Sequence, residues 1–207
     1  MLLGLLGELV SPTRCAACDL PVPRRDTFCP ACAATVEPSS PWARKGGCLA
    51  AFEYGGAMAT AIARLKYEDR PDLASRFAPS LLATARPLRG AVDLVVPVPL
   101  HAARLASRGY NQSALLATPV ARDLAVRLSP RGLVRLRDTP RQTALDRATR
   151  LANVHRAFRA RDPSVSGSRV LLVDDVRTTG ATLEDCAAAL HEAGARQVLA
   201  LVLARRS

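Results

Sequence analysis

Thirteen residues near the C-terminus, 170–182, constrain the fold more than any other part of the chain. Their sequence is VLLVDDVRTTGAT, which places four apolar residues before two adjacent carboxylates and a turn rich in hydroxyl groups. A helical pattern, LEDCAAALHEAGA, follows directly. Because a short apolar run is typical of a buried strand, the segment predicts a strand, an acidic pair at its carboxyl end and a loop that opens a helix.

The chemistry of this segment suits a sugar phosphate. The free N–H groups and positive dipole end of a helix N-terminus favour a phosphate group, and Gly180 would let the backbone approach that ligand closely. The threonine hydroxyls add donors, whereas Asp174 and Asp175 can accept from sugar hydroxyls or hold Mg²⁺. An ordinary strand, turn and helix with a solvated acidic pair is the alternative interpretation.

Composition limits the remaining possibilities. The chain has 207 residues, which suits either one domain of ordinary size or one domain with a small appendage. Because 49% of the residues are hydrophobic and only 4% are aromatic, we expect an aliphatic core. It has no apolar run of about 18 residues, so we predict no transmembrane helix. We expect a cytoplasmic protein, in which residues 1–10 form a short amphipathic helix. The net charge of +11 favours anionic partners such as phosphates, diphosphates or nucleic acid.

Four of the six cysteines form two CxxC pairs, Cys15 with Cys18 and Cys29 with Cys32. Two such turns suit tetrahedral zinc, because each aims two thiolates at one ion. Two disulfides, or reduced thiols without a metal, are the alternatives, and a cytoplasmic location argues against disulfides. We therefore predict a structural zinc module with its linker over residues 1–46, followed by a second domain over residues 47–207.

Strand-like and helix-like segments alternate through this second domain, which predicts an α/β fold with a largely parallel sheet. The expected strands are 48–54, 93–97, 133–137, 170–173 and 197–204. The expected helices are 57–67, 71–85, 111–128 with Pro119 as a local interruption, 142–154 and 183–193. Cys186 is expected in the core, and Cys48 has no CxxC partner.

A second strand end also carries polar residues. The strand at 93–97 runs into PVPLH, after which Arg104, Arg108, Asn111 and Gln112 follow. Ligands of parallel sheets bind beyond the carboxyl ends of the strands. A phosphate-binding turn beside an arginine-bearing loop would fit a substrate with a phosphate at one end and a diphosphate at the other.

Residues 170–182 resemble the signature of the type I phosphoribosyltransferases. In that family the acids bind the ribose hydroxyls of 5-phosphoribosyl-1-diphosphate (PRPP) and the turn holds its 5′-phosphate. The chain is further similar to the ComF/GntX family, through VPVPLH at 96–101, RGYNQ at 108–112, RLRDTPRQ at 135–142, RLANVHRAF at 150–158 and the double-CxxC preface.

The resemblance implies a type I phosphoribosyltransferase-like fold, a mostly parallel sheet with flanking helices, preceded by a small zinc-ribbon-like module. It implies catalytic roles for Asp174 and Asp175 and PRPP contacts from Val173, Asp174, Asp175, Val176, Arg177, Thr178, Thr179, Gly180, Ala181 and Thr182. The diphosphate-loop candidates are Val98, Pro99, Arg104, Arg108, Asn111 and Gln112, and the zinc ligands are Cys15, Cys18, Cys29 and Cys32. Magnesium would accompany PRPP.

Several of these assignments have alternatives. Arg104 and Arg108 are otherwise exposed helix charges, since arginines are mostly surface residues, and Asn111 and Gln112 are otherwise caps of the next helix. Lys66 and Tyr67 suit packing as well as a site. The basic segment 135–161 is expected to form or flank a hood, with Arg141, Gln142 and Arg150 facing the ligand.

For function, the resemblance implies a ComF-family protein that binds PRPP or a related sugar phosphate and transfers a phosphoribosyl group to an unknown acceptor, releasing diphosphate. One alternative is a non-catalytic competence or DNA-uptake factor that contacts single-stranded DNA or DNA-processing proteins through the zinc module and basic surface. Another is a regulator that senses PRPP without turnover. The sequence identifies no acceptor and leaves the oligomeric state open.

Overall fold

The computed structural model describes residues 13–40, 47–137 and 157–206. A five-stranded sheet forms its centre, in the order β1-β7-β6-β2-β3, and every neighbouring pair in it is parallel. The strands are β1 (Cys48–Glu53), β2 (Leu94–Pro97), β3 (Arg127–Leu128), β6 (Arg169–Arg177) and β7 (Gln197–Arg205). The predicted α/β fold with a parallel sheet is confirmed.

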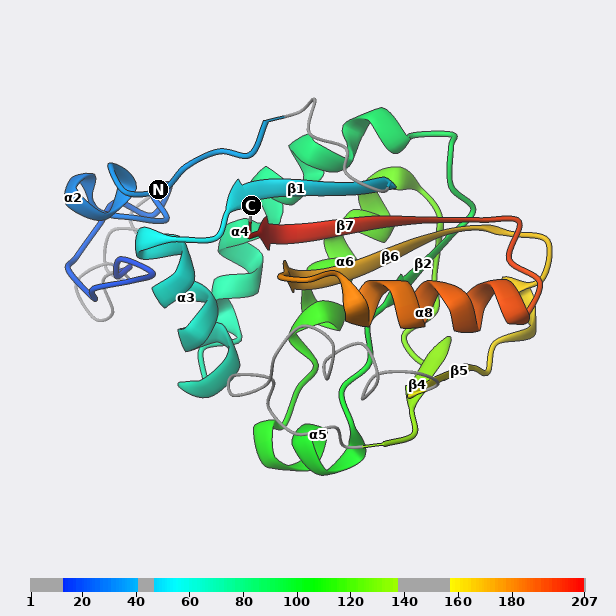
Figure 1. Cartoon of the computed structure of the whole chain (residues 1–207). Coiled ribbons are helices and arrows are strands. Elements are labelled where there is room, and N and C mark those ends of the chain that lie inside the picture. Colours follow the sequence, from blue (N-terminus) through cyan, green and yellow to red (C-terminus); the bar gives the residue numbers. More distant parts are fainter. Residues whose placement is uncertain (1–12, 41–46, 138–156, 207) are drawn as a thin grey trace, which may run out of the picture.

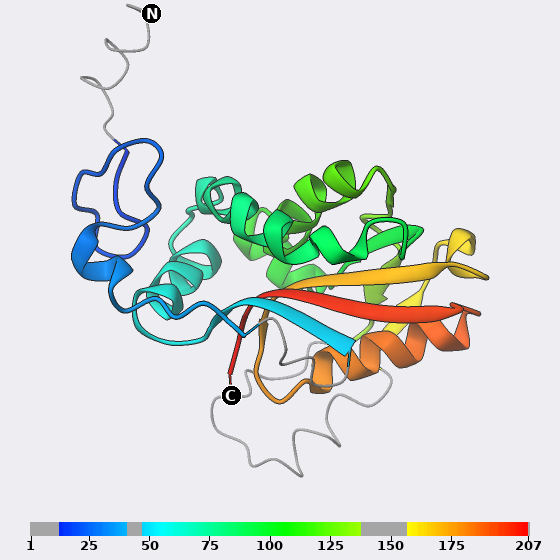
Figure 2. The ribbon, with the colours of Figure 1, turned by 90° about the horizontal axis from the view of Figure 1, so that it is seen from above.

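Helices cover both faces of this sheet (Figure 2). One face carries α3 (Gly56–Tyr67), α4 (Asp72–Ala85) and α6 (Gln112–Leu124), and the other carries α8 (Ala181–Glu192). Strand β6 shows how the sequence produces two cores: Leu171 and Val173 pack with the first group, whereas Val170 and Leu172 pack with α8. Side chains alternate across a strand, so a continuous apolar run fills both cores.

Short elements complete the fold. A two-stranded antiparallel sheet, β4 (Leu133–Arg135) with β5 (Phe158–Ala160), packs on the α8 side. The remaining helices are α2 (Pro30–Ala33), α5 (Ala102–Arg108) and the 3₁₀ turns η2 (Arg86–Leu88) and η4 (Pro163–Val165). Within the described ranges, no helix combines the length and the apolar character needed to cross a membrane.

The prediction for the third helix was wrong at its end. Helix α6 ends at Leu124, because Ala125 adopts a left-handed conformation with a φ of 55°, and Arg127 then pairs with Leu94 as part of β3. Pro119 lies inside α6 without ending it, since the fully buried Leu116 and Val120 anchor the helix on the sheet. The predicted helices at 1–10 and 142–154 lie outside the described residues, as do Arg141, Gln142 and Arg150.

The cysteine-bearing segment, residues 13–40, lies at the end of the sheet where the strands finish (Figure 1). Arg76 of α4 donates to the backbone carbonyls of Arg14, Asp26 and Thr27. The rings of Phe28 and Phe77 lie 6.4 Å apart. Ser39 N–H donates to Ala51 of β1 at 2.9 Å. Thus the segment is attached to the sheet domain at several points.

The start of α3 provides a stability prediction. Gly56 has a φ of 47°, and a Cβ there would lie 2.7 Å from Thr35 Oγ1 and closer still to the Thr35 carbonyl oxygen. We expect Gly56→Ala to lower the free energy of unfolding by about 2–4 kcal/mol, since left-handed strain adds to a backbone clash. Urea denaturation measures this. Gly55→Ala is the matched control, because its φ is −177° and a Cβ there meets nothing within 4 Å; equal losses for both variants would contradict the explanation.

Candidate functional site

The acidic pair lies where β2 turns away from β6. Pairing of β6 with β2 ends at Val173, opposite Pro97, whereas pairing with β7 continues to Arg177. Asp174 and Asp175 therefore lie within β6 near its carboxyl end, where the sequence predicted an acidic pair. The chain leaves β2 toward α6 on one face and β6 toward α8 on the other, which makes this a topological switch point, where parallel sheets bind ligands.

Asp174 is held by donors inside the protein. Its Oδ1 accepts from the hydroxyl of Ser113, at the start of α6, at 2.8 Å and from the backbone N–H of Asp175 at 2.9 Å. Burial raises the pKa of Asp174 to about 7, and the charge of Asp175 acts in the same direction. Such a shift requires a specific environment and is frequent at functional sites.

The buried Asp175 forms an ion pair with the partly buried Lys66, which reaches it from the last turn of α3. The ammonium nitrogen lies 2.6 Å from Asp175 Oδ1. Burial lowers the pKa of Lys66, but the negative charge of Asp175 more than offsets this and keeps it above the ordinary value. The other oxygen, Oδ2, is buried and has no hydrogen-bond partner in the described part of the chain. Since buried polar atoms are nearly always satisfied, a buried carboxylate oxygen that no described residue satisfies indicates room for a donor or cation from a ligand.

The turn after β6 has the form expected of an anion site. Thr178 and Thr179 are exposed, and Gly180 is buried with a φ of 91°. Residues 176–183 line a small hollow at the N-terminus of α8. A side chain at position 180 would be strained, and its Cβ would lie 3.1 Å from both Arg177 Nε and Glu184 Oε1. Glycine therefore keeps the backbone of this turn open to a ligand.

The second loop is fixed by its own side chains. Asn111 caps α6 by accepting from the backbone N–H of Ser113 at 3.0 Å, and it also donates to the Val98 carbonyl at 3.1 Å. Arg108 donates to Gln112 and stacks 5.3 Å from the ring centre of Tyr67. Arg104 lies on α5, which the sequence did not predict as a helix. Pro99 and Asn111 both line a cavity beside α5.

The structure thus brings together the acidic pair, the threonine turn and the start of α6. It ties Arg108 and Gln112 to each other rather than to the acids. Sequence reasoning did not identify Ser113 and left Lys66 undecided. Ser113 lies two residues after a helix cap, a position that faces back toward the preceding strand end, and Lys66 is one of only two lysines in an arginine-rich chain.

The raised pKa of Asp174 predicts how stability depends on pH. The native state retains a proton that the unfolded chain, with a pKa near 3.8, has already released below pH 7. Stability therefore falls as the pH rises from about 4 to about 7 and then levels off. Urea unfolding at pH 5 and pH 8 would show this loss for the wild type and a smaller one for Asp174→Asn, which cannot titrate; equal losses would contradict the assignment.

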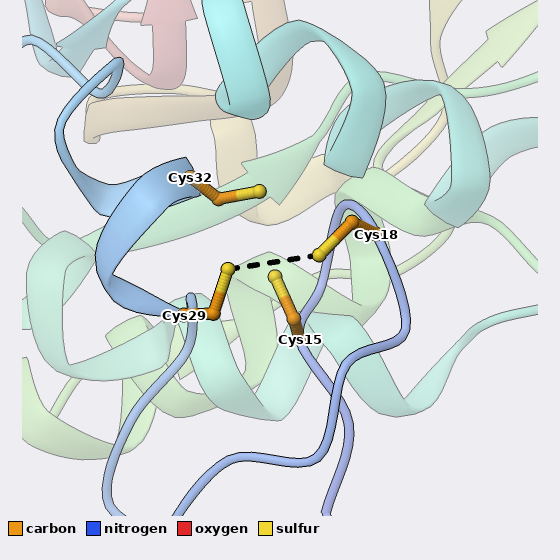
Figure 3. Close-up of side chains that lie close together, drawn as sticks. All are labelled: Cys15, Cys18, Cys29 and Cys32. Carbon is orange, nitrogen blue, oxygen red and sulfur yellow. Dashed lines mark hydrogen bonds between the residues drawn. The ribbon is translucent and has the colours of Figure 1, made fainter.

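The second cluster consists of the four paired cysteines (Figure 3). Their sulfur atoms all lie within 4.8 Å of one another, and those of Cys18 and Cys29 are 3.6 Å apart. All six cysteines are free thiols. Burial raises the pKa of Cys15, but backbone N–H groups, that of Cys29 first, outweigh it and lower the pKa to about 6. This arrangement of thiols can hold a metal ion. Cys48 and Cys186 lie in the core around α8.

Comparison with known proteins agrees with this geometry. Residues 111–207 match the phosphoribosyl transferase domain family, so the fold and the site define a phosphoribosyltransferase-domain protein. The DNA utilization protein YhgH of Escherichia coli strain CFT073 is 33% identical over 198 residues, which cover 93% of this chain and 84% of that protein. Competence protein ComFC of Bacillus subtilis is 30% identical over 144 residues, covering 69% and 57%. The chain therefore belongs to the ComF family of phosphoribosyltransferase-domain proteins.

Among solved structures, the glutamine PRPP amidotransferase of Bacillus subtilis is similar over 68% of this chain, with 25% sequence identity and a TM-score of 0.46. The similar region is 30% of that longer enzyme.

Proposed function

We propose that this protein binds PRPP together with Mg²⁺, or a closely related sugar phosphate, at Asp174, Asp175 and the turn that follows them. The observation that carries the proposal is the buried Asp175 Oδ2, which has no hydrogen-bond partner within the described residues. A ribose hydroxyl would supply that missing donor. The turn at 178–182 lies directly after the acids, and its N–H groups and threonine hydroxyls suit the 5′-phosphate of the same molecule.

The charges nearby are consistent with such a ligand. PRPP is a polyanion, and two carboxylates alone would repel it. Lys66 neutralises one of them, the pKa of Asp174 lies near neutrality, and Mg²⁺ bound to the ligand would offset much of the remaining charge. Of the sequence candidates, we retain residues 173–182 as PRPP contacts. The candidates for the diphosphate end remain Val98, Pro99, Arg104, Arg108, Asn111 and Gln112.

The chemistry such a site supports is displacement at the anomeric carbon. An acceptor forms a bond to that carbon while the bond to the diphosphate oxygen breaks, and diphosphate leaves with the electron pair. Residues at this site would orient the ribose ring and stabilise charge on the leaving group, which is electrostatic catalysis. We propose phosphoribosyl transfer to an unidentified acceptor as the reaction.

Calorimetric titration tests the binding proposal. The wild-type chain is titrated with PRPP, ribose 5-phosphate and diphosphate, each with Mg²⁺. If both ends of the ligand are recognised, PRPP binds at least about tenfold more tightly than either fragment, because linking two bound groups saves association entropy. Binding of diphosphate alone as tight as PRPP would leave the acids and the turn without a role and would refute the proposal.

A role in DNA handling is the second candidate, and two observations favour it. The relatives carry the names DNA utilization protein and competence protein, and the chain has a net charge of +11. Single-stranded DNA or a DNA-processing protein would then contact the basic surface, with affinity that falls steeply with salt. A transformation assay separates the candidates: Asp174→Ala restores uptake to a deletion strain under a purely non-catalytic role and fails to restore it if PRPP is required.

We further propose that the four cysteines hold structural zinc. A Zn²⁺ ion with Zn–S bonds of about 2.3 Å separates tetrahedral sulfur ligands by about 3.8 Å, and the Cys18–Cys29 distance of 3.6 Å is close to that value. Cys15, Cys18, Cys29 and Cys32 would complete the coordination, which leaves no open position for chemistry. We also propose that residues 1–46 form a zinc module, that residues 47–207 form a transferase-like domain, and that the protein is cytoplasmic.

A further inference from the structure

The last turn of α3 contacts the cysteine segment through Arg64. This side chain donates to the carboxylate of Asp19 and, at 3.5 Å, to the carbonyl of Ala16. Ala16 lies between Cys15 and Cys18, and Asp19 directly follows Cys18. Arg64 is only 8% exposed, and its third partner, Glu68, is the residue that directly follows α3. A buried arginine thus depends on the turn that carries two of the four cysteines.

The first turn of α3 is tied to the same segment. The hydroxyl of Thr35 donates to the Cys32 carbonyl at 2.9 Å and accepts from the backbone N–H of Ala57 at 3.0 Å. This contact satisfies one of the free N–H groups at the start of the helix. Both ends of α3 are therefore held by groups within or next to the two CxxC turns.

The three residues after Arg64 contact the candidate PRPP site. Lys66 pairs with Asp175 at 2.6 Å. The Leu65 carbonyl accepts from the hydroxyl of Tyr110, in the second loop, at 2.6 Å, and the Tyr67 ring stacks with Arg108. Four consecutive residues of one helical turn therefore connect the cysteine segment, the acidic pair and the second loop.

We propose that α3 couples metal binding at the four cysteines to ligand affinity at the acidic pair, with Lys66 as the positioning residue. A metal ion fixes the turn that presents the Ala16 carbonyl and Asp19, and these groups hold Arg64 and the last turn of α3. When the last turn of α3 is held in this position, Lys66 remains paired with Asp175. The inference rests on the proposed function of the acidic pair as a PRPP site.

The expected consequence is loss of PRPP affinity when the metal is removed. Without the metal cross-link, the turn at 15–19 is released and Arg64 loses its two external partners. The last turn of α3 then shifts, and Asp175 loses the cation that neutralises it. PRPP then meets uncompensated negative charge, and we expect its dissociation constant to rise by about tenfold, within the range typical of coupled sites.

The test combines calorimetry and hydrogen exchange on the full-length chain, zinc-loaded and metal-free, with reductant present. PRPP with Mg²⁺ is the probe. We expect tighter PRPP binding in the zinc-loaded form and faster amide exchange at residues 64–67 in the metal-free form. Equal PRPP affinity and equal exchange in the two forms would overturn the inference. No PRPP binding in either form would instead refute the proposed function, while the exchange measurement would still decide whether α3 responds to the metal.

Matched variants locate the path of the coupling. Arg64→Met in the zinc-loaded form should weaken PRPP binding about as much as metal removal does, and Lys66→Met should make PRPP affinity insensitive to metal. Asp19→Asn weakens the same contact from its exposed side and keeps a residue type that tolerates the φ of 62°. Asp19→Asn replaces Arg64→Met in this test if the Arg64→Met variant does not fold.

Arg76→Met is the control for general loosening of the cysteine segment. Arg76 holds three carbonyls of this segment from α4 and leaves the Arg64 contact intact. We expect the PRPP affinity of this variant to stay within about twofold of the wild type, as is usual for a substitution that shares no partner with the site. Equal losses for Arg64→Met and Arg76→Met would overturn the assignment of the path to α3.

Discussion

Asp174→Asn is expected to weaken PRPP binding strongly and, at the same time, to stabilise the protein above pH 7. The asparagine keeps an oxygen that accepts from Ser113 and from the Asp175 N–H. It carries no charge, so the cost of burying a carboxylate beside Asp175 disappears. A gain on the order of 1–3 kcal/mol in the free energy of unfolding follows from a pKa raised to about 7.

PRPP affinity should fall about a hundredfold in the same variant, because hydrogen bonds to a charged acceptor contribute about 1.5–3 kcal/mol. Calorimetry and urea denaturation measure the two effects. Asp123→Asn is the control, since Asp123 is a carboxylate of α6 that pairs with Arg89 at the surface, away from the acidic pair. We expect neither quantity to change in the control. A destabilised Asp174→Asn that binds PRPP normally would show that Asp174 has a structural role only.

Replacing Cys15 and Cys29 with serine is the second large change. Each contributes to a different CxxC pair, so the double variant leaves two thiols and should hold no zinc. Structural zinc sites contribute folding free energy directly; if only about 4 kcal/mol is lost, the melting temperature falls by at least about 8 °C at 2–4 °C per kcal/mol for a domain of this size.

Elemental analysis and thermal denaturation check this result. Purified wild-type chain should carry one zinc per chain, and the double variant close to none. Cys48→Ala is the matched control, because Cys48 lies outside the cluster and in the core around α8; its zinc content should equal that of the wild type. A wild type with intact thiols and no bound metal would contradict the zinc assignment.

Local sequence patterns predicted the backbone elements that carry the site. The segment 170–182 predicted a strand, a turn and a helix because each is specified by neighbouring residues, and the paired CxxC spacing similarly predicted that four thiols converge. The end of α6 was missed because Ala125 takes a left-handed conformation that alanine rarely adopts. Strand β3 then replaces the last predicted turn of helix.

The long-range contacts around the acidic pair could not be predicted in this way. Ser113 meets Asp174 across 61 positions of sequence, and Lys66 reaches Asp175 only because α3 folds back onto the carboxyl ends of the strands. Arg64 is buried against the cysteine segment, and no local pattern distinguishes it from the other arginines of the chain. Such pairings depend on the packing of whole helices on the sheet, and a single sequence contains no direct signal for them.

The central claim, that the acidic pair and the turn after it form one PRPP site, is tested most directly by a crystal structure of the chain grown with PRPP and Mg²⁺. The account predicts the 5′-phosphate within the turn at 178–182 and a ribose hydroxyl within hydrogen-bond distance of Asp175 Oδ2, the atom that has no partner in the described residues. PRPP bound elsewhere, with Asp175 Oδ2 still unpaired, would contradict it.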